Sequence, residues 1–486
     1  MQSIAQNFNV MKVSIRYIVS TSLIMLLLGL VSNACKEAPK KQSEVVDVFA
    51  AADRIVNDIV VPEFPDRNYS IMDFGAVPDG TTDNTQAIKL AIESCHTEGG
   101  GKVIVPSGRF LTGPIHLKSN VNLHLEEGAV VLFSKDSKAY LPVVHTSYEG
   151  VELMNYSPLI YAYKQKNIAV TGKGIFDGQA DKANWWPWCG AERYGYIDGE
   201  PQQKDDHNLP RLRKMNEEAT PVVDRLFGEG YQLRPSFFEP FECENILVKG
   251  VTFTNAPFWV MHPIKSNNIT IDGVTVKSHG PNNDGCDPEY SKNVRIANCV
   301  FDTGDDCIAI KSGRNDEGRR VNIPSENIVV ENCEMKDGHG GVVIGSEISA
   351  GVRNVYVRNC NMDSPNLDRA IRIKTNTLRG GFVENVFVKN IKVGQVKEAV
   401  LKINTYYAIY ANQEGDFIPS IKNIHLEDVE VENGGEYGIL IKGRVESPVE
   451  NVTLTNVHIK GAKTPLSVEN SQPIIFKNTT INGVDY

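Results

Sequence analysis

The sequence lacks several features that would assign it to a common class of protein. Its nine cysteines have no spacing typical of a zinc site. It has no excess of positive charge, because 50 Lys and Arg face 60 Asp and Glu, and the formal net charge of −10 disfavours general binding to nucleic acid or to acidic membranes. Its apolar run at residues 17–31 is too short for a transmembrane helix. With 41% hydrophobic residues, the chain also shows no sign of bulk disorder.

The N-terminus has the pattern of an export signal. Positive charges at residues 11–16 precede the apolar run, and small residues precede Cys35. A cysteine at this position indicates acylation of Cys35 as in bacterial lipoproteins, although Ser32 stands where a lipobox usually has Leu. Cleavage near Ala34 and simple secretion is the alternative. We therefore expect export to the bacterial periplasm or outer membrane, with membrane contact only through the lipid, or secretion.

A degenerate repeat occupies most of the remaining chain. Its segments begin with Asn and alternate apolar and polar residues, as in Asn268-Ile-Thr-Ile-Asp-Gly, and from Asn245 onward they start 23 to 38 residues apart. This alternation predicts half-buried strands, and a repeat without helical segments between strands predicts a β-solenoid of stacked coils. The recurring Asn is expected to bond to the turn backbone and to the Asn of the next coil. The segments begin at Asn167, Asn245, Asn268, Asn293, Asn327, Asn354, Asn385, Asn423 and Asn451.

A second strand follows in each coil. Alignment of four such strands places Ile308, Val342 and Ile371 in one column and Ile310, Ile344 and Ile373 in another, and these columns should point inward. Because side chains alternate between the faces of a strand, the intervening positions should point outward. The outward columns are Asp287, Ala309, Val343 and Arg372, and then Glu289, Lys311, Gly345 and Lys374. Cys299, Cys333 and Cys360 occupy one place in three coils and are interpreted as an interior column of small side chains.

Reactive side chains fall on successive coils of this stack. Neighbouring strands lie about 4.8 Å apart, so groups on adjacent coils are within reach of one sugar or two. Asp305 and Asp306 are consecutive, and a bend or bulge must aim both of them outward. Together the groups can protonate a glycosidic oxygen, activate water and hold an anionic sugar, whereas each alone would be an ordinary turn residue or solvated charge. They are Asp284, Asp305, Asp306, His339, Arg372 and Lys374.

In order and in combination, these motifs resemble those of the polygalacturonase family of glycoside hydrolases (family 28). The Asp-Asp, Gly-His-Gly and Arg-Ile-Lys motifs are intact, whereas Asn282-Asn283-Asp284 departs from the usual Asn-Thr-Asp. Residues 73–133 resemble the N-terminal part of pectinase-like β-helices. The resemblance implies an all-β fold, a single-stranded right-handed parallel β-helix with a short N-terminal helical cap.

The resemblance also implies a role for each group. Asp305 matches the general acid, and Asp284 and Asp306 match the pair that activates water. His339 matches the residue that helps to set the protonation of the acid, while Arg372 and Lys374 match the cations that hold the substrate carboxylate. The family inverts anomeric configuration, which requires acid and base carboxyls about 6.5–9.5 Å apart. A neighbouring carboxylate is expected to raise the pKa of the acid. No cofactor or metal is implied.

Further side chains are candidates beside this group. Lys311, Asp287 and His262 are expected to bind substrate, with ordinary solvated or structural roles as the alternative. Trp259 is expected to pack. The tryptophans at residues 185, 186 and 188 either form a sugar platform or hold their segment down, and the arginines at 314, 319 and 320 extend the basic surface near Lys311.

The chain is therefore expected to have four parts. These are a signal at residues 1–35, a tether and a short end-capping helix at 36–60, a catalytic β-helix at 61–486 and, within it, an insertion at 179–241. The expected activity is inverting hydrolysis of α-1,4-galacturonosyl linkages by a monomer acting on pectic polysaccharide or oligogalacturonides. The insertion would make the enzyme exo-acting by blocking the groove. The alternatives are a rhamnogalacturonan hydrolase, a polysaccharide lyase and a non-catalytic glycan-binding β-helix.

Overall fold

The computed structural model describes residues 48–408 and 414–486. The signal expected at residues 1–35, with Cys35, lies outside these residues, and so does the tether up to residue 47. No helix in the described part of the chain is long and apolar enough to cross a membrane.

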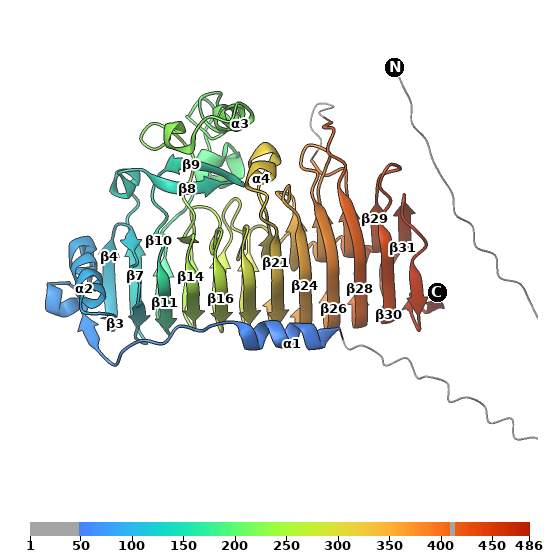
Figure 1. The fold of residues 1–486 in the computed structure, drawn as a ribbon, viewed down its shortest axis with the longest axis horizontal. Coiled ribbons are helices and arrows are strands. Elements are labelled where there is room, and N and C mark those ends of the chain that lie inside the picture. Colours follow the sequence, from blue (N-terminus) through green and yellow to red (C-terminus); the bar gives the residue numbers. More distant parts are fainter. Residues whose placement is uncertain (1–47, 409–413) are drawn as a thin grey trace, which may run out of the picture. The chain divides into compact units, whose positions relative to one another are not determined.

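The described chain winds into stacked coils, and each strand pairs in parallel with a strand of the neighbouring coil (Figure 1). This is the right-handed parallel β-helix expected from the sequence. The Asn-started strands of the largest sheet are β11 (Lys166–Gly172), β14 (Glu244–Lys249), β16 (Asn267–Asp272), β18 (Lys292–Ala297), β21 (Ser325–Glu331), β24 (Val352–Met362), β26 (Phe382–Gln395), β28 (Ser420–Asn433) and β30 (Glu450–Ile459). The second strands form a six-stranded sheet of β20 (Ile308–Ile310), β23 (Val342–Gly345), β25 (Arg369–Lys374), β27 (Ala399–Asn404), β29 (Gly435–Lys442) and β31 (Ala462–Glu469).

The predicted asparagine ladder is present and explains the repeat. Asn268 Nδ2 donates to Asn245 Oδ1 at 3.0 Å, and Asn327 Nδ2 donates to Asn293 Oδ1 at 3.0 Å. Each repeat-starting Asn has a positive φ, such as 56° at Asn268, which Asn tolerates better than most residues. One rung differs from the expectation, because Asn293 bonds to Asn267 rather than to Asn268.

The predicted inward columns are correct. Ile308 pairs with Val342 and Val342 with Ile371, while Ile310 pairs with Ile344 and Ile344 with Ile373. All six side chains are buried in one continuous core, and Cys299, Cys333 and Cys360 are buried in it as well. The cysteines of the described residues are all free thiols.

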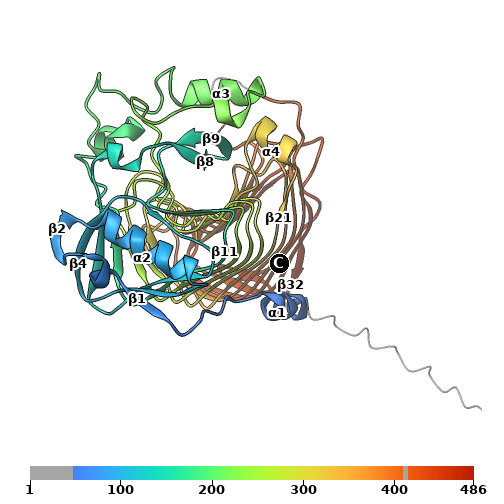
Figure 2. The ribbon, with the colours of Figure 1, turned by 60° about the vertical axis from the view of Figure 1, so that its left-hand side comes forward.

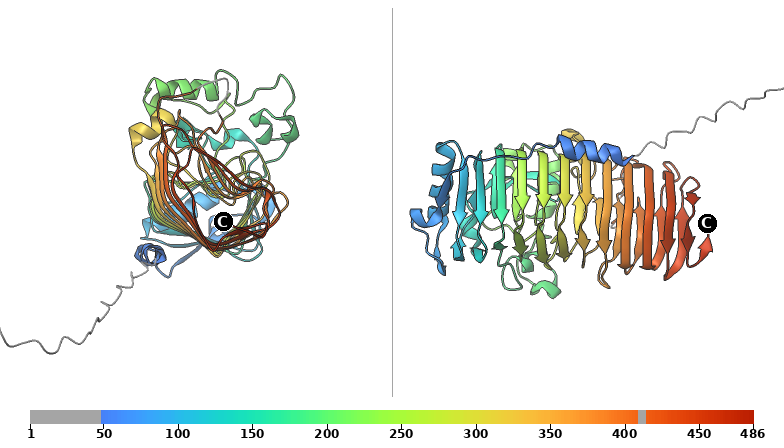
Figure 3. Two further views of the ribbon diagram at one scale, coloured as in Figure 1. Left: turned by 90° about the vertical axis from the view of Figure 1, so that its right-hand side faces the viewer. Right: turned by 90° about the horizontal axis from the view of Figure 1, so that it is seen from below.

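The capping helix is not the expected one. The helix predicted within residues 36–60 is α1 (Phe49–Asp58), and it lies along the side of the stack, where Phe49 packs edge-on against Tyr356 (Figure 3). The N-terminal end is instead covered by α2 (Thr85–Thr97), which buries Ile88 and Ile92 in the core (Figure 2). The stacked aromatic side chains on the outer face of the largest sheet, Tyr356 and Phe387, give α1 its apolar contact.

Several segments gather on the side of the stack that carries the six-stranded sheet (Figures 1 and 2). They are the hairpin of β8 (Val144–Tyr148) and β9 (Val151–Asn155), α3 (Leu209–Glu217) and α4 (Asn315–Val321). α3 lies in the long connection between β12 (Ile175–Asp177) and β13 (Phe238–Phe241), which corresponds to the predicted insertion, although β13 itself pairs with β10 (Ile160–Tyr163) in the coil stack.

The tryptophans of this connection hold it against the coils. Trp185 is buried and its ring lies 5.5 Å from that of Tyr140 and 4.9 Å from that of Trp188. Trp186 Nε1 donates to the Ala256 carbonyl at 2.9 Å. Of the two roles considered for these residues, the contacts favour anchoring the segment.

Candidate active site

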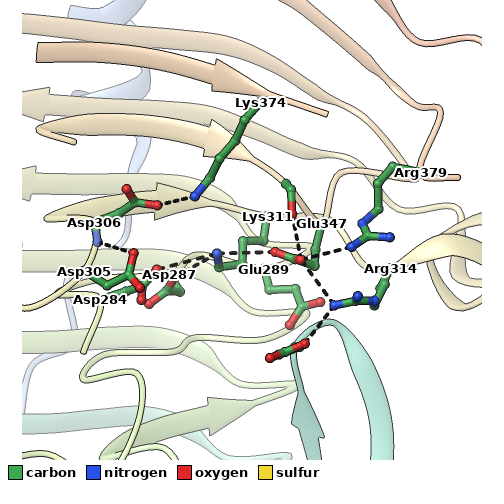
Figure 4. Close-up of polar contacts among 12 residues, drawn as sticks. Asp284, Asp287, Glu289, Asp305, Asp306, Lys311, Arg314, Glu347, Lys374 and Arg379 are labelled. Carbon is green, nitrogen blue, oxygen red and sulfur yellow. Dashed lines mark hydrogen bonds and ion pairs between the residues drawn. The ribbon is translucent and has the colours of Figure 1, made fainter. Parts of the chain in front are cut away.

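The reactive side chains lie where three strands of the six-stranded sheet begin and end (Figure 4). Asp305 and Asp306 precede β20, separated from it by Cys307, and Lys311 directly follows the strand. Arg372 and Lys374 belong to β25, two coils further along, and their alternating positions in the strand give them the same face.

Three carboxylates converge at this place. Oxygens of Asp284, Asp305 and Asp306 lie within 4.8 Å of one another. The bend required to bring the two consecutive aspartates together is present, and the Asp306 amide donates to Asp305 Oδ1 at 3.0 Å. These nearest oxygens are closer than the about 6.5–9.5 Å expected between the carboxyls of an inverting pair. The reason is that two of the residues are adjacent in sequence and the third belongs to the neighbouring coil.

Asp306 is held by the two cations of β25. Lys374 Nζ lies 2.6 Å from Asp306 Oδ2, and Arg372 Nη1 lies 3.5 Å from Oδ1. The ring of Tyr407 faces both cations at 5.2 Å and 5.3 Å. Burial lowers the pKa of Lys374, but the charge of Asp306 more than offsets this, so the pKa lies above its ordinary value.

Lys311 binds the carboxylates on the other side of the group. Its Nζ lies 3.7 Å from Asp284, 3.3 Å from Asp287 and 3.5 Å from Glu347, and 4.4 Å from the centre of the Trp259 ring. Burial, followed by the charge of Asp287, raises the pKa of Asp284 well above its usual range. Burial also raises the pKa of Asp287 to about 8, against the opposing effect of Lys311. Burial therefore favours the protonated form of both carboxyls.

Asp305 is the most accessible of the three carboxylates and is paired with His339. Its side chain is 20% exposed, and its Oδ1 lies 2.9 Å from His339 Nδ1. The hydrogen bond to Asp305 raises the pKa of His339 in spite of burial. Burial raises the pKa of Asp305, but His339 and the nearby lysines more than offset this, so the pKa lies below its ordinary value. The expectation that neighbouring carboxylates raise the pKa of Asp305 is therefore wrong, because the hydrogen bond and charge of His339 lower it.

Two predicted substrate-binding residues lie below the surface. His262 is fully buried between Glu289, whose oxygen is 2.8 Å from Nε2, and Glu239, whose oxygen is 3.4 Å from Nδ1. Asp287 is fully buried beneath Lys311. The β8–β9 hairpin covers this region, with Thr146 donating to Glu239 at 2.5 Å. The expectation that His262 and Asp287 bind substrate directly is corrected accordingly.

A pocket of about 250 Å³ opens beside the carboxylates. Its lining includes Asp284, Asp305, Lys311 and Lys374, and it adds residues that the sequence analysis did not single out. Arg379 follows the end of β25 by five positions, and its closeness to Lys374 in the sequence could have indicated that it lines the pocket. Nothing in the repeat pattern indicates that residues of α3 or of the hairpin line it. The added residues are Glu149, Arg213, Glu347, Arg379 and Tyr407.

Within residues 48–408 and 414–486, two clusters have the donor types of a metal site. One is the three carboxylates, but Lys311, Lys374 and Arg372 already supply positive charge there. The other joins His279, Asp302 and Asp337, where His279 Nε2 lies 2.7 Å from Asp302 Oδ1. The second cluster is outside the pocket of the carboxylates.

Comparison with known proteins agrees with the fold and identifies the family. The family model described as glycosyl hydrolases family 28 matches residues 227–480, and a model described as rhamnogalacturonase A/epimerase, pectate lyase-like, matches residues 68–125. The chain is 29% identical over 403 residues to a probable polygalacturonase of Vitis vinifera, covering 80% of this chain and 74% of that protein. It is 28% identical over 445 residues to an exo-poly-alpha-D-galacturonosidase of Dickeya chrysanthemi, covering 85% and 71%.

A solved structure is also similar over nearly its whole length. A hyperthermoactive exopolygalacturonase from Thermotoga maritima superposes with a TM-score of 0.86 at 44% identity, covering 90% of this chain and 97% of that chain. The family 28 match includes Asp284, Asp305, Asp306, His339, Arg372 and Lys374. This chain belongs to glycosyl hydrolases family 28 and is a glycoside hydrolase.

Proposed function

We propose that this glycoside hydrolase cleaves α-1,4-galacturonosyl linkages of pectin-type polysaccharides. The observation that carries the proposal is the buried pair of cations, Arg372 and Lys374, next to a cluster of three carboxylates. A hydrolase for neutral sugars has no need of two cations there, whereas a galacturonate carries a carboxylate that such cations can bind. Similar proteins named as polygalacturonases support the same substrate.

In the proposed mechanism, Asp305 protonates the glycosidic oxygen. Asp305 is the accessible carboxylate and takes its proton from the His339 imidazolium, with which it is hydrogen-bonded. The substrate carboxylate binds Lys374 and Arg372 and thereby competes with Asp306 for them. Asp306 is then free to accept a proton from a water molecule that Asp284 helps to orient. The water oxygen bonds to the anomeric carbon as the protonated leaving oxygen departs, with inversion.

We further propose that the enzyme attacks chain ends. The β8–β9 hairpin, α3 and α4 rise on the face that carries the carboxylates, and Glu149, Arg213 and Arg314 line the pocket there. A sugar chain cannot run straight on through the space that these residues fill. Two of the similar proteins are named as exo-acting.

Hydrolysis of polygalacturonate tests the proposal. Purified protein should release reducing sugar, with monomer as the early product, without any gain in ultraviolet absorbance and without dependence on calcium. Absorbance of an unsaturated product would indicate a lyase instead, and release from rhamnogalacturonan but not from polygalacturonate would move the substrate to that polymer. Binding without any release would identify a non-catalytic glycan-binding protein.

Proton NMR of the first product tests the stereochemistry. An inverting enzyme forms the β anomer first from an α linkage. The α anomer would instead indicate a retaining route, for which carboxyls about 5–5.5 Å apart are typical.

The pH profile tests the proton on the Asp305–His339 pair. Asp305 raises the pKa of His339 above 6.5, the ordinary pKa of His. The decline of kcat/KM on the alkaline side of its pH profile should therefore occur above pH 6.5. In His339→Asn, Asp305 must hold the proton alone beside Lys374 and Lys311, so the alkaline limb should move to lower pH. An unchanged alkaline limb in this variant would show that His339 does not set the protonation of the acid.

We also propose that the chain is exported and acts as a monomer, with acylation at Cys35 or simple cleavage near Ala34. The signal pattern at residues 1–35 supports export. The mass of the mature N-terminus distinguishes a lipid at Cys35 from a free terminus, and the size of the delipidated protein in solution tests the monomer.

A further inference from the structure

Three arginines form one wall of the pocket, and we call Arg213, Arg314 and Arg379 the arginine wall. They come from separate parts of the chain: α3 in the long connection, the residue before α4, and the loop after β25. All three line the same pocket as Asp305 and Lys374. In Figure 4, Arg314 and Arg379 surround Glu347, with Lys311 between them and the aspartates.

The arginine wall has more cations than the carboxylates that it contacts. Glu149 accepts from Arg314 at 2.8 Å and from Arg213 at 3.3 Å. Glu347 lies 3.5 Å from Arg314, Arg379 and Lys311. Within these ion pairs, the three guanidinium groups share two carboxylates, whereas Lys311 has Asp284 and Asp287 as further partners. The three arginines therefore outnumber the carboxylates with which they pair.

Two of the three arginines are largely buried, with side chains 7% exposed at Arg379 and 13% exposed at Arg314. Burial, followed by the charge of Arg314, lowers the pKa of Arg379 to about 9. Burial also lowers the pKa of Arg314, although Glu149 opposes this effect. The Nε atoms of all three arginines are buried without a hydrogen-bond partner among the described residues. Guanidinium groups crowded in this way are suited to bind an added carboxylate.

The wall is held rigidly by its backbone neighbours. The Arg314 amide donates to the Gly150 carbonyl at 3.0 Å, which ties α4 to the turn of the hairpin. Gly150 has a φ of 79°, and a Cβ there would lie 2.9 Å from the Arg314 nitrogen, so this close approach requires glycine. Arg379 Nη1 donates to Asn315 Oδ1 at 2.7 Å. These contacts, with the bond from Arg314 to Glu149, position Arg314 and Arg379 before any ligand binds, which reduces the entropic cost of binding.

We propose that the arginine wall binds the carboxylate of the terminal uronic acid, so that the enzyme selects chain ends that carry a free carboxylate. This rests on the proposed function and adds a second carboxylate site to the one at Arg372 and Lys374. Lys374 and the arginine wall line the same pocket as Asp284 and Asp305. Arg213 is the specificity-determining residue that the long connection contributes.

Arg213→Gln tests the proposal, because the Arg213 side chain is 43% exposed and forms an ion pair with Glu149 at the rim of the wall. The substrates are trigalacturonate and two analogues in which a neutral galactose replaces the uronate at one end or at the other. The wild-type enzyme should prefer trigalacturonate about 10- to 100-fold in kcat/KM over one of the two analogues, as expected for charge-assisted hydrogen bonds. In Arg213→Gln this preference should shrink, through a higher KM for trigalacturonate and little change for that analogue.

Two controls separate this outcome from a structural effect. Arg211→Gln changes another arginine of α3, which packs on Phe227 and Tyr231 outside the pocket, and it should keep the wild-type preference. Arg379→Gln should reduce the preference as Arg213→Gln does, and it decides the question if Arg213→Gln does not fold.

An unchanged preference in a folded variant, or an equal loss on all three substrates, would overturn the terminal-carboxylate site while leaving galacturonan hydrolysis intact. Failure of the wild-type enzyme to cleave any of the three substrates would overturn the proposed function itself.

Discussion

Asp305→Asn is expected to lower kcat by about 10²- to 10⁴-fold, the usual contribution of a general acid, while KM changes little. The amide cannot donate a proton to the glycosidic oxygen, but it has nearly the same shape and can keep a hydrogen bond to His339. Because the Asp305 side chain is partly exposed, the fold should persist. Steady-state kinetics on trigalacturonate, with a direct binding measurement, checks both parts.

Asp302→Asn is the matched control. Asp302 lies in β19 (Val300–Thr303) and pairs with His279, outside the pocket of the three carboxylates. Its replacement should leave kcat near that of the wild type. If Asp305→Asn retains wild-type turnover, Asp305 is not the acid.

Lys374→Met is expected to weaken both the fold and the substrate complex. It leaves the buried Asp306 paired with Arg372 at the longer distance of 3.5 Å, and removal of one partner of a buried ion pair typically lowers the free energy of unfolding by about 3–5 kcal/mol. Loss of a charge-assisted hydrogen bond to the substrate carboxylate, about 1.5–3 kcal/mol, should lower kcat/KM by roughly 10- to 150-fold. Chemical denaturation and steady-state kinetics measure the two effects.

The double variant Lys374→Met with Asp306→Asn separates these effects. Asp306→Asn removes the carboxylate charge that has lost Lys374 as its partner, and this should restore most of the lost stability. It should not restore activity, because both the carboxylate and the cation are then missing. Recovery of activity in the double variant, or an unaltered unfolding free energy in Lys374→Met, would contradict the role of this buried pair.

The coil stack could be predicted from the sequence because the features that produce it are local and recur in each coil. Alternation fixed which residues face the core, and the asparagine ladder requires the same side chain at the same left-handed turn in each coil. Ile308, Val342 and Ile371 lie at equivalent positions of neighbouring strands. Lys311 and Lys374 follow them at fixed offsets and therefore lie near the aspartates.

What the sequence could not predict depends on segments outside the repeat. Arg213 lies in a helix with no repeat register, and Glu149 lies at the tip of a hairpin, so their positions follow from tertiary packing. The same hairpin buries His262, which is why its predicted contact with substrate fails. The pKa of Asp305 depends on the balance between burial and the charge of His339, a balance set by distances in space rather than by spacing in sequence.

A crystal structure of Asp305→Asn with bound trigalacturonate tests the central claim most directly. We predict that a glycosidic oxygen lies about 2.6–3.2 Å from the side chain at position 305, with a uronate carboxylate on Arg372 and Lys374 and a water molecule between Asp284 and Asp306. A sugar bound elsewhere on the molecule, or one whose glycosidic oxygens are all out of reach of position 305, would contradict it.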